Sequence, residues 1–575
     1  MSSSRRGGAF LAAMLAALSG CGSSQPVAGA GRVLITHTEN LSGDAALDGT
    51  ARVVSHLVRS QLAGSKSLAV FEAADPSEAL QRRAGRIVRS WLDAAGGKLM
   101  LHVTVRSAEG KTLEQWESAV PAIEGSAVLA AAVVKHLAPA APVGPAVPSE
   151  AASLFGQALV ASAADAIPLL QKVVAQSPAW GDAYYLLGAN LAATGKTDEA
   201  LRVWKAGTSR ATDEVSKARM AIGIAAAMKE PAAAVEANEK LAALLPSEPE
   251  IAMQAGELRL ARNELPQAAA LMKRAVEAQP GAGEWWNTLA FVQAFTGDEK
   301  AAMESIRRYE QLSPQAANPP DSRGEIQFLM GQFRQASASF EEAFRKEPSF
   351  LAGATLLKSA DALLMAGDTA GADKEFQRYL TGTLKGHPLR ELILARWEFQ
   401  TGKKVEAFRR TTAFASAAGT APDLAAAGWI EIAWWQLRAG DRTKALEAAK
   451  TALQKAQSPA AKREALLPFY LAQPSGTLED WKRRANGNPP ADILALALVF
   501  DHKWKDAVPV LAELVAKTHP FRAGHWRVLY AWALTETGQA EKAREWLRWY
   551  PIPLSSGGDM IEPLVMEKVV KLRKR

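Results

Sequence analysis

Apolar and polar positions follow two different patterns along the chain. Within residues 31–138, one segment alternates between the two kinds of side chain, with apolar residues at Leu99, Leu101, Val103 and Val105. A period of two is typical of a β-strand with one buried face. From about residue 150 onward, small and large apolar residues recur in a fixed order at a pitch of about 34 residues, which is typical of stacked helical units. The chain is therefore predicted to be mainly α, with a small α/β domain ahead of a helical array.

The same patterns predict the elements of the first region. Strands are expected near residues 33–35 and 68–71, and three antiparallel strands separated by glycine turns are expected within 86–120. Helices are expected at 47–63, 76–83 and 126–137.

The polar run Glu39-Asn40-Leu41-Ser42-Gly43-Asp44 has two interpretations. Glu39 and Asp44 are residue types that serve as a catalytic carboxylate pair. Asn, Ser, Gly and Asp are also what a strand-to-helix turn and its N-cap require. The turn is favoured.

Small residues at fixed positions define the repeated unit of the helical region. One copy contains Gly331, Ala336, Phe340, Ala343 and Pro348. Small residues let two helices approach closely, and the proline stops the second helix. Matching positions in other copies are Gly188, Ala200, Gly256, Ala268, Ala275, Pro280, Trp286, Ala302 and Pro314. The pattern resembles the tetratricopeptide repeat (TPR) family, which implies a TPR-type α-α superhelix, or solenoid, whose groove takes an extended peptide or a partner helix.

The region in front of the array resembles the TolB-like amino-terminal domain. The resemblance rests on Glu39 to Asp44 and on the phrase Leu113-Glu114-Gln115-Trp116, whereas His37 and Thr38 stand where the family usually has a proline and an aromatic residue. Four prolines spaced by three residues then predict a stiff polyproline spacer. The expected division is a signal peptide at 1–20, a TolB-like domain at 31–138, a proline-rich spacer at 139–149, a TPR array at 150–472, a break at 473–489, and TPR-like helices with a basic tail at 490–575.

The first residues have the features of an export signal. Arg5 and Arg6 precede a short apolar stretch, which Leu18-Ser19-Gly20-Cys21 follows directly. This tetrad resembles the bacterial lipobox, which implies cleavage before Cys21 and a lipid on its thiol. By the same resemblance, Gly22 after the cysteine favours the outer membrane. The chain is thus expected to be a lipoprotein anchored in the outer-membrane bilayer through Cys21, facing the periplasm, with no disulfide because Cys21 is its one cysteine.

Charge and motif searches indicate no catalytic chemistry. The 67 basic and 60 acidic residues are interspersed, so the net charge of +7 does not predict a nucleic-acid partner. The run from Asn190 to Thr197 lacks the first glycine of a phosphate-binding loop. His519 and His525 have no third metal ligand nearby in sequence. We therefore expect no enzyme, no catalytic residue, no metal, and no cofactor except the lipid on Cys21.

The tryptophan residues do not decide between a protein ligand and a sugar ligand. The chain has 16 of them, and four fall beside expected core positions as candidate ligand-facing aromatics: Trp285, Trp435, Trp546 and Trp549. Packing between repeats is the favoured reading, and stacking on a sugar or peptide is the other. The predicted function is a periplasmic scaffold or adaptor that binds protein partners in the cell envelope. The alternative is a glycan- or peptidoglycan-binding lipoprotein, or an accessory to polysaccharide export.

Overall fold

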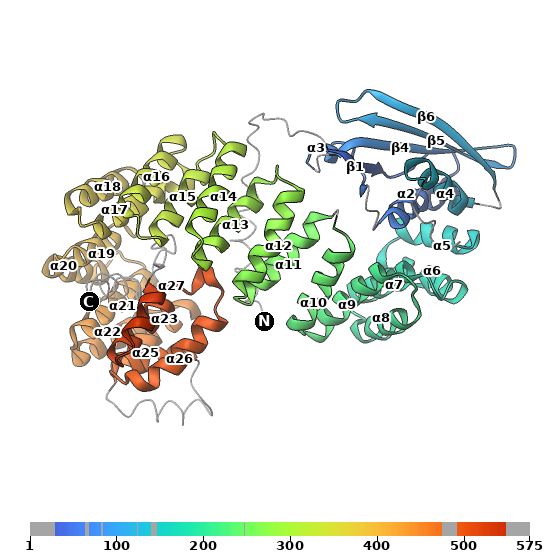
Figure 1. Cartoon of the computed structure of the whole chain (residues 1–575). Helices are drawn as coiled ribbons and strands as arrows, with labels where there is room; N and C mark the ends of the chain where they lie inside the picture. Colours follow the sequence, from blue (N-terminus) through green and yellow to red (C-terminus); the bar gives the residue numbers. More distant parts are fainter. Residues whose placement is uncertain are drawn as a thin grey trace. The chain divides into compact units, whose positions relative to one another are not determined.

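The computed structural model describes residues 29–63, 68–81, 84–122, 125–139, 147–246, 248–473 and 491–547. These residues form two compact units: the first contains 29–259 and 266–285, and the second contains 260–265 and 286–547. Figure 1 shows their elements coloured along the sequence. Within these ranges, no helix has both the length and the apolar character needed to cross a bilayer. The lipobox residues Leu18, Ser19, Gly20 and Cys21, together with the basic tail, lie outside the described residues.

A mixed sheet opens the first unit. Its strands are β1 (Gly29–Thr36), β2 (Glu39–Asn40), β3 (Ala69–Ala73), β4 (Ala84–Ala95), β5 (Lys98–Ser107) and β6 (Thr112–Pro121). The main order is β3-β1-β4-β5-β6, in which β1 is parallel to both neighbours and β4, β5 and β6 are antiparallel. The strands expected near 33–35, near 68–71 and within 86–120 are confirmed.

One 3-10 helix and three α-helices complete the α/β domain: η1 (Ala45–Leu47), α2 (Asp48–Leu62), α3 (Glu78–Gln81) and α4 (Gly125–Leu137). The helix expected at 76–83 has only four residues. The Glu39 to Asp44 run forms a turn, because the Asp44 carboxylate accepts from Ala46 N at 2.9 Å and caps η1, while Glu39 pairs with Arg89. The interpretation of Glu39 and Asp44 as a turn is therefore the one the geometry supports.

Helix pairs make up the rest of the described chain. In order, they are α5 (Ser149–Val160), α6 (Ala163–Gln176), α7 (Gly181–Ala193), α8 (Thr197–Arg210), α9 (Glu214–Met228), α10 (Pro231–Leu244), α11 (Pro249–Ala261), α12 (Leu265–Ala278), α13 (Gly283–Thr296), α14 (Glu299–Leu312), α15 (Asn318–Leu329), α16 (Phe333–Lys346), η2 (Phe350–Gly353), α17 (Ala354–Met365), α18 (Thr369–Gly382), α19 (Arg390–Gln400), α20 (Lys404–Ser416), α21 (Pro422–Ala439), α22 (Arg442–Lys455), α23 (Pro459–Leu471), α25 (Ala491–Phe500), α26 (Trp504–Lys517), η3 (Pro520–Arg522), α27 (Gly524–Glu536) and α28 (Ala540–Leu547). The fold class is thus a TPR-type helix-pair array preceded by a small α/β domain.

Close contacts inside each pair explain the small residues of the repeat. A side-chain carbon added to Gly256 in α11 would lie 2.7 Å from Met272 Cγ in α12, which is too close for any real contact. The alanines twelve residues after each such position are fully buried: Ala200, Ala268, Ala302 and Ala336. Pro280, Pro314 and Pro348 each stand two residues after the second helix of a pair ends. The signature residues therefore set how closely the two helices pack and where the second one stops.

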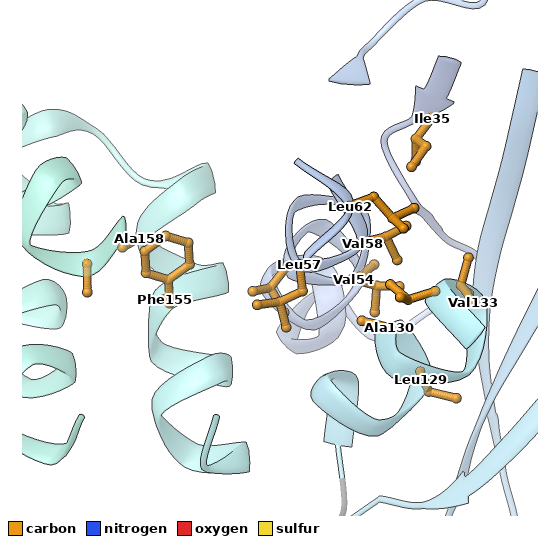
Figure 2. Close-up of a cluster of buried hydrophobic side chains, with 14 of the residues drawn as sticks. Ile35, Val54, Leu57, Val58, Leu62, Leu129, Ala130, Val133, Phe155 and Ala158 are labelled. Atoms are coloured by element: carbon orange, nitrogen blue, oxygen red, sulfur yellow. The ribbon is translucent and has the colours of Figure 1, made fainter. Parts of the chain in front are cut away.

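The α/β domain and the first repeats share one hydrophobic core. Figure 2 shows Val54 and Val58 of α2 beside the α4 residues Leu129 and Val133, with Leu57 on the side toward α5. Gly49 in α2 and Gly156 in α5 lie so close that a side-chain carbon on Gly49 would be 2.5 Å from Gln157 N. The expected spacer at 139–149 therefore does not separate two independent domains. Its residues 140–146 lie outside the described residues.

Helices on both sides of the expected break at 473–489 also share one core. Residues of α23 and of α25 belong to the same buried cluster. Arg442 at the start of α22 donates to Gln473 O at 3.2 Å and to Phe500 O at 3.1 Å, which links the two flanks directly. The break does not divide the array into two sub-arrays, and the boundary between the compact units lies near residues 260–286 instead. Residues 474–490 lie outside the described residues.

Candidate functional site

Asp182, at the start of α7, joins the array to helix α2 of the α/β domain. Its carboxylate accepts from Ser60 Oγ in α2 at 2.7 Å and from Ser216 Oγ in α9 at 2.9 Å, and its Oδ2 lies 3.3 Å from His56 Nε2. Ser, His and Asp are the residue types of a hydrolytic triad, but Ser60 donates to the aspartate rather than to the histidine. The arrangement is therefore a polar joint and not an activated nucleophile.

Charges around the joint keep its carboxylates ionised. Burial would raise the pKa of Asp182, but the hydrogen bond and charge of His56, with Arg219, outweigh it and hold that pKa well below its usual range. Burial is likewise outweighed at Glu72 on β3, whose pKa is lowered mainly by Arg52. Arg52 and Glu72 are in direct contact.

A second polar contact extends this joint along α2. Arg59 donates to both carboxylate oxygens of Glu248, at 3.0 and 3.1 Å, just before α11 begins. Helix α2 therefore contacts α5, α7 and the residue before α11.

The last helices of the second unit contact its first ones. Asn263 Nδ2 donates to Val515 O at the end of α26, across 252 residues of sequence, at 3.2 Å. The Phe521 ring in η3 lies 5.1 Å from both Phe291 and Phe295 of α13, measured between ring centroids. Arg527 of α27 lies over the Phe295 ring at 5.5 Å. We call these contacts the C-terminal clasp.

A row of polar side chains runs along the first helices of four consecutive pairs. Lys358 in α17 is fully buried and donates to Asp321 Oδ2 at 2.8 Å and to Glu325 Oε1 at 2.5 Å, both in α15. Burial would lower the pKa of Lys358, but the two carboxylates outweigh it and raise the pKa. Burial raises the pKa of Asp321 to about 6, with Lys358 opposing and Glu325 reinforcing the rise. Lys358 is thus a buried cation beside the carboxyl groups of Asp321 and Glu325.

The row continues into α19 and α21. Gln400 Nε2 donates to Asp361 Oδ1 at 3.3 Å, whereas the buried Asp361 Oδ2 has no hydrogen-bond partner among the described residues. Burial raises the pKa of Asp361 to about 8, and the Gln400 hydrogen bond opposes only part of the rise. Arg396 donates to Glu431 Oε1, and the other carboxylate oxygen of Glu431 also has no partner there. Burial raises the pKa of Glu431 against the opposing charge of Arg396. The polar row is defined as Asp321, Glu325, Lys358, Asp361, Arg396, Gln400 and Glu431.

The candidate tryptophans occupy different environments. Trp435 is only 2% exposed and stacks on Phe399 with ring centroids 4.4 Å apart, so of the two interpretations it takes the favoured one, packing, and does not face a ligand. The ring belongs to a buried cluster with Ala395, Phe399 and Ala407. Trp546 is half-buried against Tyr530 and Arg527. Trp285 is half-buried in α13, and Trp549 lies outside the described residues.

The two histidines considered as metal ligands, His519 and His525, pack against aromatic rings. His519 stacks on Phe521, and the His525 ring lies tilted against Trp526 with ring centroids 4.4 Å apart. Across the described ranges, no group of three or more histidine, cysteine or acidic residues is arranged to hold a metal ion. The sequence reasoning missed Gly324 in α15, where a side-chain carbon would lie 2.6 Å from Phe340 Cε1. Its twelve-residue spacing from Ala336 matches that of Gly188 from Ala200, so the signal was present. Gly331 ends the same helix, with a φ of 75°.

A two-helix repeat protein is the class that these elements define. Residues 253–317 match the tetratricopeptide repeat family. No curated protein sequence matches the chain. Solved structures with similar helix pairs include YrrB, described as a TPR protein with an unusual peptide-binding site, at 14% identity and a TM-score of 0.28 over 31% of this chain and 92% of that one. Another is the C-terminal part of a TPR repeat-containing protein from Cytophaga hutchinsonii, at 13% identity and a TM-score of 0.30 over 55% of this chain and 97% of that one. A third is pilF of Pseudomonas aeruginosa, at 18% identity and a TM-score of 0.26 over 38% of this chain and 95% of that one. Arrays of such repeats are protein-interaction scaffolds.

Proposed function

We propose that this protein is a membrane-anchored scaffold of the bacterial cell envelope, held on the outer membrane by a lipid on Cys21 and facing the periplasm. Its array binds protein partners there, and it performs no catalysis. The observation that carries the proposal is the stacked helix-pair array, which follows an amino-terminal Leu18-Ser19-Gly20-Cys21 tetrad. Multiple acyl chains on one cysteine would hold the protein on a bilayer without any membrane-spanning helix.

The described tryptophans do not favour the glycan-binding alternative. Sugar stacking needs an aromatic face open to solvent. Instead, six of these rings lie in the core, each less than a tenth exposed: Trp204, Trp397, Trp434, Trp435, Trp526 and Trp532. Protein binding is therefore the function that we put forward.

Replacing Cys21 with alanine tests the anchor. We expect the Cys21→Ala variant to move from the membrane fraction to the soluble periplasmic fraction, because one acceptor thiol carries all of the lipid. Ser23→Ala is the matched control, since it changes a neighbouring residue and keeps the thiol. Sedimentation of Cys21→Ala with the outer membrane in high salt would show that the lipid assignment is wrong.

Crosslinking in living cells tests the scaffold. We expect discrete protein adducts when a photo-reactive residue replaces exposed residues of the helix pairs, such as Val405, and identification of the same adducts by mass spectrometry in repeated experiments. The same residue placed at buried Ala407 is the negative control. A complete absence of protein adducts together with saturable binding of oligosaccharides would replace the scaffold with the glycan-binding alternative.

A further inference from the structure

The outer edge of β6 is an unpaired edge of the sheet. β6 ends the strand order, and its ten residues run antiparallel to β5. Figure 1 shows β6 at the margin of the sheet. Among the described residues, the backbone of β6 makes hydrogen bonds with β5 and with no other segment. Every second residue of an edge strand directs its N–H and C=O groups outward, so β6 presents a row of backbone donors and acceptors.

The two edges of the sheet differ in length and burial. Most residues of β6 are exposed, and Val120 is the one buried residue of the strand. β3, at the other edge, has only five residues, and none of them is exposed. A long, exposed edge is a template for pairing with another strand, whereas a short, buried one is not. β6 is therefore the edge to which a further strand can be added.

Acidic side chains stand along the β6 edge. Glu114 and Glu117 are the charged residues of β6, and 51% and 57% of their side chains are exposed. Each carboxylate meets one histidine: His136 Nε2 lies 2.8 Å from Glu114 Oε2, and His102 Nδ1 lies 2.9 Å from Glu117 Oε1. The exposed fractions show that both carboxylates still reach solvent and can accept a further partner.

The neighbouring basic residues stand at the ends of the strand. Lys98 and Arg106 of β5 pair with the two end residues of β6, Pro121 and Thr112, and Lys111 comes directly before β6. β6 itself contains no basic residue. Side chains interact most strongly with those directly opposite on the next strand. A strand added outside β6 would therefore meet two carboxylates and no cation.

The same charges decide against a second copy of this strand. Two β6 strands side by side would bring four glutamates together with no basic residue in either strand, and like charges across strands destabilise a sheet. Charged residues on an edge are a usual protection against such pairing. The protection is selective, because a strand with lysine or arginine opposite the glutamates is attracted instead.

We propose that the outer edge of β6 is a docking site for an extended basic segment of a partner protein, which adds a strand to the sheet. Main-chain hydrogen bonds hold the segment, and lysine or arginine side chains three positions apart pair with Glu114 and Glu117. The site lies in the α/β domain. It goes beyond the proposed scaffold function, because it is a binding surface separate from the array.

Binding of a labelled peptide to the purified protein, followed by fluorescence anisotropy, tests the charge preference. We expect the peptide TKVTKVT to bind at least about tenfold more tightly than TEVTEVT, because two attractive pairs replace two repulsive ones. Glu114→Gln and Glu117→Gln are each expected to weaken binding of TKVTKVT by about two- to fivefold. Glu109→Gln, which changes an exposed residue in the turn before β6, is the matched control. Absence of saturable binding by TKVTKVT, or an equal loss in the control, would overturn the basic-ligand assignment.

Two N-methylated forms of TKVTKVT test the strand pairing itself. Methyl groups on every second amide block one edge of an extended peptide and leave the other edge free. An added strand pairs through one of its edges, so we expect one form to bind like the unmodified peptide and the other to lose at least about tenfold in affinity. Equal affinities of the two forms would overturn strand addition.

Hydrogen exchange in the presence of TKVTKVT locates the bound peptide. We expect slower exchange of the amides of β6 and unchanged exchange of those of β3, which is the internal control. Slower exchange confined to the helix pairs would overturn the assignment of the site to β6. Crosslinking at Val405 reports on the array and not on this edge, so failure of the docking site and failure of the proposed scaffold function are distinguishable.

Discussion

Asp361 gives the sharpest test of the electrostatics in the second unit. Its carboxyl is buried in α17 with one hydrogen bond, from Gln400, and burial raises its pKa from 3.8 to about 8. The folded protein therefore keeps the proton through a pH range in which the unfolded chain releases it. Stability falls with rising pH wherever the folded state binds more protons than the unfolded state. Asp361 should thus reduce stability progressively from about pH 4 to about pH 8.

The Asp361→Asn variant removes this effect because an amide has a shape close to the neutral carboxyl and does not ionise. Each pKa unit corresponds to about 1.4 kcal/mol, so the penalty at pH 7 is on the order of 4 kcal/mol and is close to zero at pH 4. We expect the variant to unfold at higher urea concentration than the wild type at pH 7, and at nearly the same concentration at pH 4. Tryptophan fluorescence follows the transition, because the second unit contains buried Trp397 and Trp435.

Asp182 in the first unit is the matched control. It is equally buried, but its four polar neighbours lower its pKa, so the carboxylate stabilises the folded state above pH 4 and this contribution is lost as the pH falls. The same Asp-to-Asn change should therefore have opposite signs at the two sites. Parallel stability profiles of Asp361→Asn and the wild type between pH 4 and pH 8 would refute the reasoning about burial.

Two further predictions concern the joint between α2 and the array. Asp182→Asn should lower the midpoint of thermal unfolding of the first unit more at pH 7 than near pH 2, and a change that is equal at both values would contradict a role for the charged carboxylate. Gly49→Ala should destabilise the same unit by about 1–3 kcal/mol, measured by urea denaturation, because the new carbon would overlap Gln157 N. Gly382→Ala, in a helix with open space around the glycine, is the control, and equal effects of the two substitutions would argue against the close approach.

Local rules predicted much of the fold from the sequence. Period-two alternation located β5, and the spacing of glycine, alanine and proline located the helix pairs, because both patterns report contacts between residues close in sequence. The turn from Glu39 to Asp44 followed from the same kind of rule. The small-residue position at Gly324 obeys the same spacing, but Gly331, seven residues later in the same copy, was taken as the glycine of that copy.

Contacts between distant parts of the chain were beyond these rules. Prolines at 139–149 predicted separation, whereas the close approach of Gly49 and Gly156 joins the two regions in one core. The sequence left two interpretations of Trp435, and only the structure shows that Phe399, 36 positions earlier, stacks on it. The polar row also depends on packing between consecutive pairs. Burial of Asp361 or Glu431 has no signature in the sequence around either residue.

The docking of α2 has a practical consequence for dissecting the molecule. The first helix pair of a repeat array has no preceding pair to cover its apolar face. Here α2 covers that face of α5, including Phe155. A fragment that starts at residue 150 would expose that ring to water and lose the contacts of Ser60 and His56 with Asp182. Such a fragment is expected to self-associate in solution. The α/β domain therefore has to accompany the repeats in any truncated version that is meant to stay monomeric.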